Sequence, residues 1–203
     1  MKKTFALISM ILLATIASQP AIAGDAERGK SIATTCLACH GETGNSMAGA
    51  FPNIAGQNEQ YLLKQLIDVR DGMREIPTMI GQLDNFSDAD LADIAAYYAS
   101  QERGYGAAKR DLVDMGETIY RFGIARKNVA ACTACHSPNG MGNGPAGFPA
   151  LAGQWPEYTV SQLKAFQSGA RHNDGDGKMM RSTALDMNEQ EMNAVASYIY
   201  GLK

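Results

Sequence analysis

Hydrophobic residues recur three and four positions apart in several stretches of the chain, the spacing that places them on one face of a helix. No stretch alternates apolar and polar residues over the length that a strand needs. The stretches that predict helices are residues 25–36, 58–71, 115–122, 157–168 and 188–200, and the segment that follows Ser87. We therefore predict an all-α protein.

Residues typical of helix ends border these stretches. Asp25 suits the N-cap of the first helix, and Gly72 ends the second. Ser87 followed by Asp90 resembles a capping box, with Asp in place of the usual Glu.

The second half of the chain repeats the first in the same order. The offset between matching positions grows from 96 to 97 and then 101, as small loop insertions would produce after a duplication. The matching segments are 51–57 with 148–154, Tyr61 with Tyr158, 65–66 with 162–163, and 93–98 with 194–199. We predict two tandem domains, residues 24–100 and 111–203, joined by a linker at 101–110.

The first 23 residues have the pattern of an export signal. Residues 2–3 form a basic start, residues 5–17 are apolar but too short to span a bilayer, and residues 21–23 offer small side chains for cleavage. We predict a mature chain that begins at or near Gly24, outside the cytoplasm. No later apolar run approaches the ~20 residues that a membrane span needs.

The mature chain is acidic, and its charge is uneven. Without the two lysines of the leader, 16 basic side chains face 21 acidic ones, a net charge of −5. Residues 24–105 carry a net −6 and residues 106–203 a net +1. This balance argues against nucleic acid as a partner. The asymmetry is consistent with a dipolar molecule that orients toward a partner, or with ordinary solvated charges.

Two copies of Cys-x-x-Cys-His carry the most specific chemistry. They consist of Cys36, Cys39 and His40, and of Cys132, Cys135 and His136. This is the attachment motif of a c-type haem, because two thiols add across the vinyl groups of one porphyrin and the adjacent imidazole reaches the iron. We predict two covalently bound haem c groups with His40 and His136 as proximal ligands.

Other uses of these cysteines fit less well. Paired Cys-x-x-Cys zinc motifs usually lie about 15–20 residues apart, far closer than the two motifs here. A thioredoxin-like pair needs a βαβ context, and the local pattern is helical. Disulfides are possible in an exported protein, but all four cysteines belong to the two motifs.

The second axial ligand of each iron decides whether the metal is open to other molecules. His172 is the one remaining histidine and lies in a polar loop, where a solvated residue is the simpler interpretation. Methionine suits a low-spin haem. Aligning the final helices places Met79 opposite Met180, with Met179 as a competitor for the second haem.

The other methionines have simpler explanations. Met47, Met73 and Met141 have no partner in the repeat, so we expect loop or packing roles. Met115 and Met192 fall within predicted helices, where we expect core positions.

Four features occur in both halves of the chain: the haem motif, the Phe-Pro-x-Ile/Leu-Ala-Gly-Gln segment, a spaced methionine and an Ala-x-Tyr final helix. Together they resemble the dihaem cytochrome c4 family over essentially the whole mature chain. Residues 85–88 also look typical of it. The resemblance implies two class I cytochrome c folds with His40 and Met79 on haem 1, and His136 and Met180 on haem 2. The segment between residues 71 and 79 is more compact than we expect for that family.

The repeated Phe-Pro segments offer support for the ligand histidines. Ligating imidazoles commonly donate their second N–H to a carbonyl. By analogy with the family, we expect the carbonyls of Pro52 and Pro149 to accept those bonds. The alternative is that these prolines only turn the chain.

The resemblance implies a periplasmic electron carrier, often loosely associated with the membrane, and we expect a monomer. Its donors would be a bc1-type complex or small copper or cytochrome carriers, and its acceptor a terminal oxidase. With both irons six-coordinate, no substrate could bind. A dihaem peroxidase would need one open iron site and an extra histidine, for which His172 is the only candidate. A subunit of a larger dehydrogenase or oxidase is a further alternative.

Overall fold

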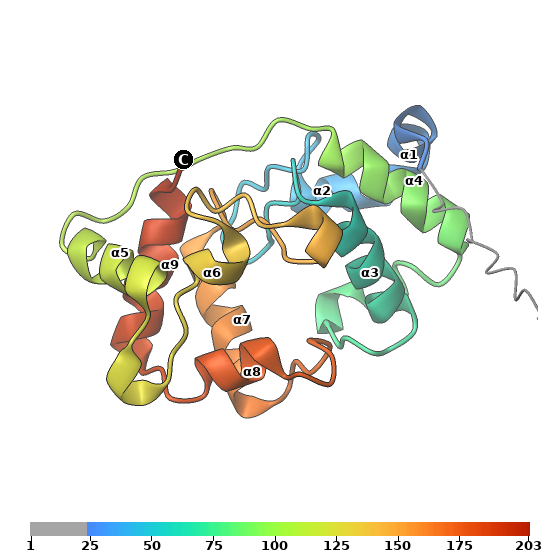
Figure 1. The fold of residues 1–203 in the computed structure, drawn as a ribbon. Coiled ribbons are helices and arrows are strands. Elements are labelled where there is room, and N and C mark those ends of the chain that lie inside the picture. Colours follow the sequence, from blue (N-terminus) through green and yellow to red (C-terminus); the bar gives the residue numbers. More distant parts are fainter. Residues whose placement is uncertain (1–23) are drawn as a thin grey trace, which may run out of the picture.

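The computed structural model describes residues 24–203 as two helical lobes joined by an extended segment (Figure 1). The predicted export signal lies outside the described residues. The helices are α1 (Ala26–Ile32), α2 (Leu37–His40), α3 (Glu59–Arg70) and α4 (Asp88–Ala99) in the N-terminal lobe, and α5 (Val113–Phe122), α6 (Thr133–His136), α7 (Pro156–Ser168), α8 (Met179–Ala184) and α9 (Glu189–Gly201) in the C-terminal lobe. Short 3-10 segments are η1 (Ala33–Cys36), η2 (Pro77–Met79), η3 (Ala125–Lys127) and η4 (Gly144–Ala146).

The prediction of an all-α fold is confirmed. Within residues 24–203 there are two isolated β-bridges and no strand. The helices predicted from apolar spacing are present, although the first ends at Ile32 and continues as η1 and α2 into the haem motif. The short helix α8 was not predicted. Residues 102–109 have no regular structure and connect the lobes.

Each lobe is built around a crossing of its first and last long helices. A Cβ on Gly29 of α1 would come within 1.9 Å of the carbonyl oxygen of Asp93 on α4. In the second lobe, a Cβ on Gly116 of α5 would come within 2.3 Å of the carbonyl oxygen of Ala194 on α9. Glycine at both crossings lets the helix backbones touch, so the duplicated lobes use the same packing device.

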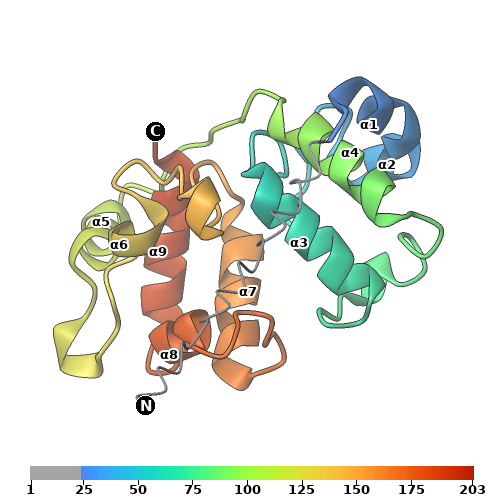
Figure 2. The ribbon, with the colours of Figure 1, turned by 45° about the vertical axis from the view of Figure 1, so that its right-hand side comes forward.

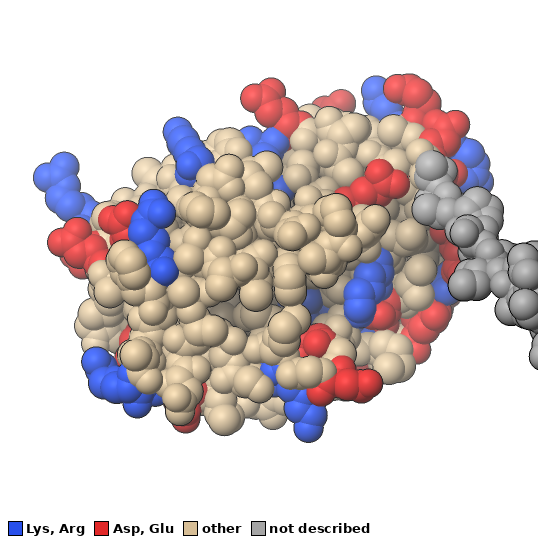
Figure 3. All heavy atoms as spheres, viewed as in Figure 1, with Lys and Arg blue, Asp and Glu red and all other residues tan. Residues whose placement is uncertain are grey.

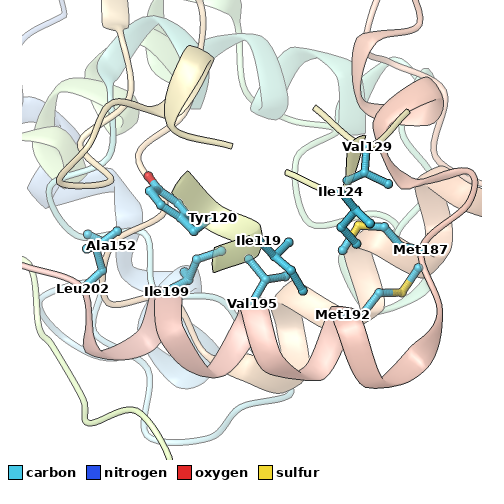
Figure 4. Packing of buried hydrophobic residues seen from close by; sticks show 10 residues of the cluster. All are labelled: Ile119, Tyr120, Ile124, Val129, Ala152, Met187, Met192, Val195, Ile199 and Leu202. Carbon is cyan, nitrogen blue, oxygen red and sulfur yellow. The ribbon is translucent and has the colours of Figure 1, made fainter. Parts of the chain in front are cut away.

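Small apolar cores fill the space beside these crossings. In the C-terminal lobe, Tyr120 from α5 and Val195 and Ile199 from α9 pack together (Figure 4). Met192 is buried there, as predicted. Met115 is 39 % exposed, so its predicted core position is wrong. The buried face of α5 is formed by Ile119 and Tyr120, and Met115 lies away from it.

The last helix of each lobe begins with a capping box. Ser87 and Asp90 form the predicted box at the start of α4. Asn188 and Glu191 form an equivalent box at α9, which was not predicted from the sequence. These bonds satisfy backbone N–H groups that the first helical turn leaves without partners.

The repeated Phe-Pro segments pair with each other across the boundary between the lobes. The backbone N–H of Asn53 donates to Gln154 Oε1 at 2.9 Å, and Gln154 Nε2 donates to the Asn53 carbonyl at 2.8 Å. The backbone N–H of Ala150 and the side chain of Gln57 make the corresponding pair of bonds at 2.7 and 2.8 Å. All four residues are buried, so the duplicated segments form a polar, nearly symmetric interface.

Both signs of charge occupy the surface. On the face in Figure 3, acidic side chains gather over the lobe that contains α1–α4, alongside some basic ones, and lysines and arginines stand out over the other lobe. Within residues 24–203 no helix is both long and apolar enough to cross a bilayer.

Candidate functional site

The first haem motif lies at the turn from η1 into α2. Its histidine, His40, is 9 % exposed, and its Nδ1 lies 3.0 Å from the carbonyl oxygen of Pro52. Burial lowers the pKa of His40 below its ordinary value, and the hydrogen bond to Pro52 opposes that shift. The ring is therefore neutral at pH 7. With its Nδ1 proton donated to the carbonyl, Nε2 keeps the lone pair that a metal needs.

The second motif repeats this geometry on α6. His136 is 6 % exposed, and its Nδ1 lies 2.8 Å from the carbonyl oxygen of Pro149. Burial likewise lowers the pKa of His136. The sulfur of Cys132 packs against the core of the lobe, and burial raises the pKa of its thiol to about 11. Each lobe thus presents one neutral imidazole in a fixed orientation.

The chain turns sharply after each histidine. Gly41 has φ 77° and Ser137 has φ 65°, and both have extended ψ values, a region that is essentially reserved for glycine. The hydroxyl of Ser137 accepts the backbone N–H of Met141 at 3.0 Å, which helps to hold the unfavourable turn. The second motif therefore carries backbone strain that its glycine counterpart avoids.

The two candidate methionines lie in the matching part of each lobe. Met79 ends η2 and is half-buried against the N-terminal core. Met180 lies in the first turn of α8 and is half-buried, whereas its neighbour Met179 is 50 % exposed. His172 is exposed. This burial favours Met180 over Met179, and the assignment of both iron ligands remains a prediction.

The remaining loop methionines are on the surface. Met47, Met73 and Met141 are 95 %, 56 % and 41 % exposed. None of them belongs to a hydrophobic core cluster of the described residues. Of the two roles expected for them, loop or packing, the loop role fits.

An ion pair between Asp174 and Arg181 joins the two ends of the segment that leads to Met180. Asp174 Oδ1 accepts a 2.6 Å bond from Arg181 Nε, and Asp174 Oδ2 accepts the backbone N–H of Arg181 at 3.0 Å. Arg181 Nη2 also donates to the carbonyl of Gly175 at 3.1 Å. Because Arg181 directly follows Met180, these bonds fix the backbone that presents its sulfur.

Three arginines that no sequence motif had marked are buried between the lobes. One of them, Arg103, donates to the carbonyls of Gly56 and Ala152, and the other two bond to side chains of α3 and α7. Arg74 and Arg171 are 7 % and 8 % exposed, and among residues 24–203 neither guanidinium makes an ion pair. Their partners are neutral phenol and amide groups. Buried charges usually require an opposite charge.

Haem fits this set of residues. Its propionates would supply negative charge for buried guanidinium groups that make no ion pair within residues 24–203. The hydroxyl of Tyr98 is buried beside the Cys36 thiol and meets no oxygen or nitrogen partner within residues 24–203. The residues of each lobe can therefore hold a porphyrin by two thiols and one imidazole, with cationic side chains for its acidic edge.

Comparisons with known proteins agree with this geometry. The profile of the cytochrome c family matches residues 26–102 and 123–203. Cytochrome c4 of Azotobacter vinelandii is 48 % identical over 206 residues, covering 97 % of this chain and 98 % of that protein. The crystal structure of reduced recombinant cytochrome c4 from Pseudomonas stutzeri superposes with a TM-score of 0.88 at 47 % identity, covering 89 % of this chain and all of that one. A thiosulfate dehydrogenase electron acceptor of Thiomonas intermedia is 35 % identical over 175 residues, covering 82 % of this chain and 78 % of that protein.

Proposed function

Because the chain belongs to the dihaem cytochrome c4 family and is therefore an electron-transfer protein with two haem c groups, we propose that it shuttles single electrons in the periplasm between respiratory donors and a terminal oxidase. The donors would be a bc1-type complex or small copper or cytochrome carriers. As in its cytochrome c4 relatives, the chain is an electron carrier and not an enzyme.

The observation that carries this proposal is the same constellation in both lobes. Each has a neutral, buried histidine oriented by a proline carbonyl, and a half-buried methionine at the matching position. The thioethers would hold the porphyrin, and the two axial ligands would leave no position on the iron open to substrate. Each haem supplies an iron that cycles between the ferric and ferrous states.

Every site residue has one role in this proposal. Cys36 and Cys39 attach haem 1, and Cys132 and Cys135 attach haem 2. The iron ligands are His40 and Met79 on haem 1 and His136 and Met180 on haem 2. The carbonyls of Pro52 and Pro149 keep each imidazole in the tautomer and orientation that the iron requires. The chain would thereby give both irons the same pair of axial ligands.

Substitution of the methionines tests the ligand assignment. Met79→His should leave both haems attached and lower the reduction potential of haem 1 by on the order of 0.1 V or more, because axial ligands set potentials over about 0.8 V. Met180→His should do the same to haem 2 alone. The measurement is a redox titration with the two haems resolved by NMR.

Met179→His provides the matched comparison for the second haem. It should leave both potentials within error of the native values, because the Met179 side chain is exposed. If Met179→His lowered the second potential and Met180→His did not, Met179 would be the ligand.

A second candidate function is suggested by the relatives named thiosulfate dehydrogenase electron acceptor. In this alternative, the chain takes electrons from a dedicated dehydrogenase instead of a respiratory carrier. Reduction of the purified protein by a thiosulfate dehydrogenase, at a rate that a bc1-type complex does not approach, would favour it over the oxidase pathway.

A further inference from the structure

Two of the buried arginines, Arg74 and Arg171, belong to the segments that lead to the candidate methionine ligands. Arg74 lies five residues before Met79, and Arg171 lies nine residues before Met180. The backbone N–H of each arginine donates to a carbonyl near the end of the preceding helix, to Asp68 and to Ala165, at 2.9 Å in both cases. The arginines are therefore equivalent in the repeat, and each is fixed at the start of its own methionine segment.

The side chain of each arginine reaches into the other lobe. Arg74 Nη2 donates to the hydroxyl of Tyr158 and to Gln162 Oε1 on α7, both at 2.9 Å. Figure 2 shows that α7 and α3 face each other between the lobes. The methionine segment of the N-terminal lobe is thus hydrogen-bonded to the C-terminal lobe.

Arg171 makes the reverse contacts. Its Nη2 donates to the hydroxyl of Tyr61 and to Gln65 Oε1 on α3, both at 2.9 Å. Each guanidinium also bonds the glutamine of its own lobe, Arg74 to Gln65 at 2.9 Å and Arg171 to Gln162 at 2.8 Å. The three pairs of equivalent residues, Tyr61 with Tyr158, Gln65 with Gln162 and Arg74 with Arg171, share one offset of 97 residues.

We propose that Arg74 and Arg171 are positioning residues that hold each methionine on its iron by anchoring its segment to the opposite lobe. This inference rests on the proposed ligands Met79 and Met180. Its consequence is that methionine binding at one haem depends on a tyrosine of the other domain. The bonds from these two arginines to the opposite lobe are named the crossed arginine contacts.

The two crossed arginine contacts are not equally reinforced. Asn173, in the second methionine segment, also donates to Gln65 at 2.9 Å and to Asp68 at 2.6 Å, and Lys64 donates to the carbonyl of Asn173 at 3.1 Å. Within residues 24–203, the first methionine segment crosses to the other lobe through Arg74 alone. Haem 1 should therefore respond more strongly to loss of its contact.

Removal of one hydroxyl at a time tests the proposal and leaves both arginines in place. The holoproteins Tyr158→Phe and Tyr61→Phe are titrated with imidazole in the ferric state, and NMR follows the bound methionine methyl signal of each haem. Met79→His and Met180→His assign those signals. Tyr105→Phe is the matched control, because Tyr105 is exposed and makes no side-chain hydrogen bond within the described residues.

Each tyrosine substitution should affect the haem of the opposite lobe. Tyr158→Phe should lower the imidazole concentration that displaces half of the Met79 ligand about tenfold, because a lost hydrogen bond to a charged group raises the fraction of open haem 1. Haem 2 should not change. Tyr61→Phe should act on haem 2 alone and less strongly, and Tyr105→Phe should act on neither.

Three other results would overturn the proposal. If each tyrosine affected the haem of its own lobe, or if neither variant changed imidazole binding, the crossed arginine contacts would not position the methionines. If the native protein lacked the two methionine methyl signals, the ligand assignment itself would be wrong, and the crossed arginine contacts would lose their role with it.

Discussion

At the level of single residues, burial lowers the pKa of each candidate ligand histidine, and one hydrogen bond sets its tautomer. The carbonyls of Pro52 and Pro149 face the Nδ1 atoms of His40 and His136 at 3.0 and 2.8 Å. The Phe-Pro segment follows both motifs at nearly the same distance, so both carbonyls could be named from the sequence, and their role in supporting iron ligands stays a prediction.

Neither arginine of the crossed arginine contacts was predicted from the sequence as a site residue. Arg74 and Arg171 lie in loops of different length and composition. Only the folded lobes bring their guanidinium groups to Tyr158 and Tyr61. Both arginines share the 97-residue offset of the tyrosines, so the repeat contains them, but a long-range contact between side chains leaves no signal in the sequence that pairs each arginine with the tyrosine of the other lobe.

Asp174→Asn tests the ion pair beside Met180. The side chain of Asp174 is 6 % exposed, and its bonds to Arg181 are charge-assisted, so the substitution should lower the free energy of unfolding by about 1–3 kcal/mol. It should also ease displacement of Met180 by imidazole and leave haem 1 unchanged. Denaturant unfolding of the holoprotein gives the first quantity.

Asp176→Asn is the control for that variant. Asp176 lies in the same loop, is exposed and makes no ion pair within residues 24–203, so its effect should stay within about 0.5 kcal/mol. Equal effects of the two substitutions would show that the loop, and not the Asp174–Arg181 pair, determines the result.

At the level of secondary structure, apolar spacing and capping residues predicted the long helices because these signals are local. Helix α8 has only six residues, too few to show a repeat, and it begins at the two adjacent methionines. The box at α9 uses Asn188 in place of Ser or Thr, which made it less evident than the box at Ser87. In α5 the sequence located the helix, but the choice of buried face depends on how it crosses α9.

The cap of α9 gives the prediction at this level. Asn188→Ala removes the side-chain acceptor for the backbone N–H of Glu191, now 2.9 Å away, and should lower the free energy of unfolding by about 1 kcal/mol. Asn193→Ala, an exposed change within the same helix, should be neutral or slightly stabilising because alanine has the higher helix propensity. If Asn188→Ala changed the free energy of unfolding no more than Asn193→Ala does, the stabilising role of the capping box would be contradicted.

At the level of the whole molecule, duplication explains both the fold and the interface. Each lobe has a small core of its own, as domains of this size do, and carries one haem attachment motif. The sequence repeat predicted two tandem domains. It could not predict that the repeated Phe-Pro segments bond to each other, since Gln57 and Gln154 are equally compatible with contacts inside one lobe. That interface places the two haem-binding lobes in fixed contact.

The central claim is that both irons are closed by methionine, so that the protein carries electrons and binds no substrate. The most direct test is the optical spectrum of the ferric holoprotein, with a haem count, before and after carbon monoxide is added to the reduced form. We expect two haems, two equivalents of the weak sulfur-to-iron charge-transfer band, and no response to carbon monoxide. One such band, with a second haem that binds carbon monoxide, would contradict the claim.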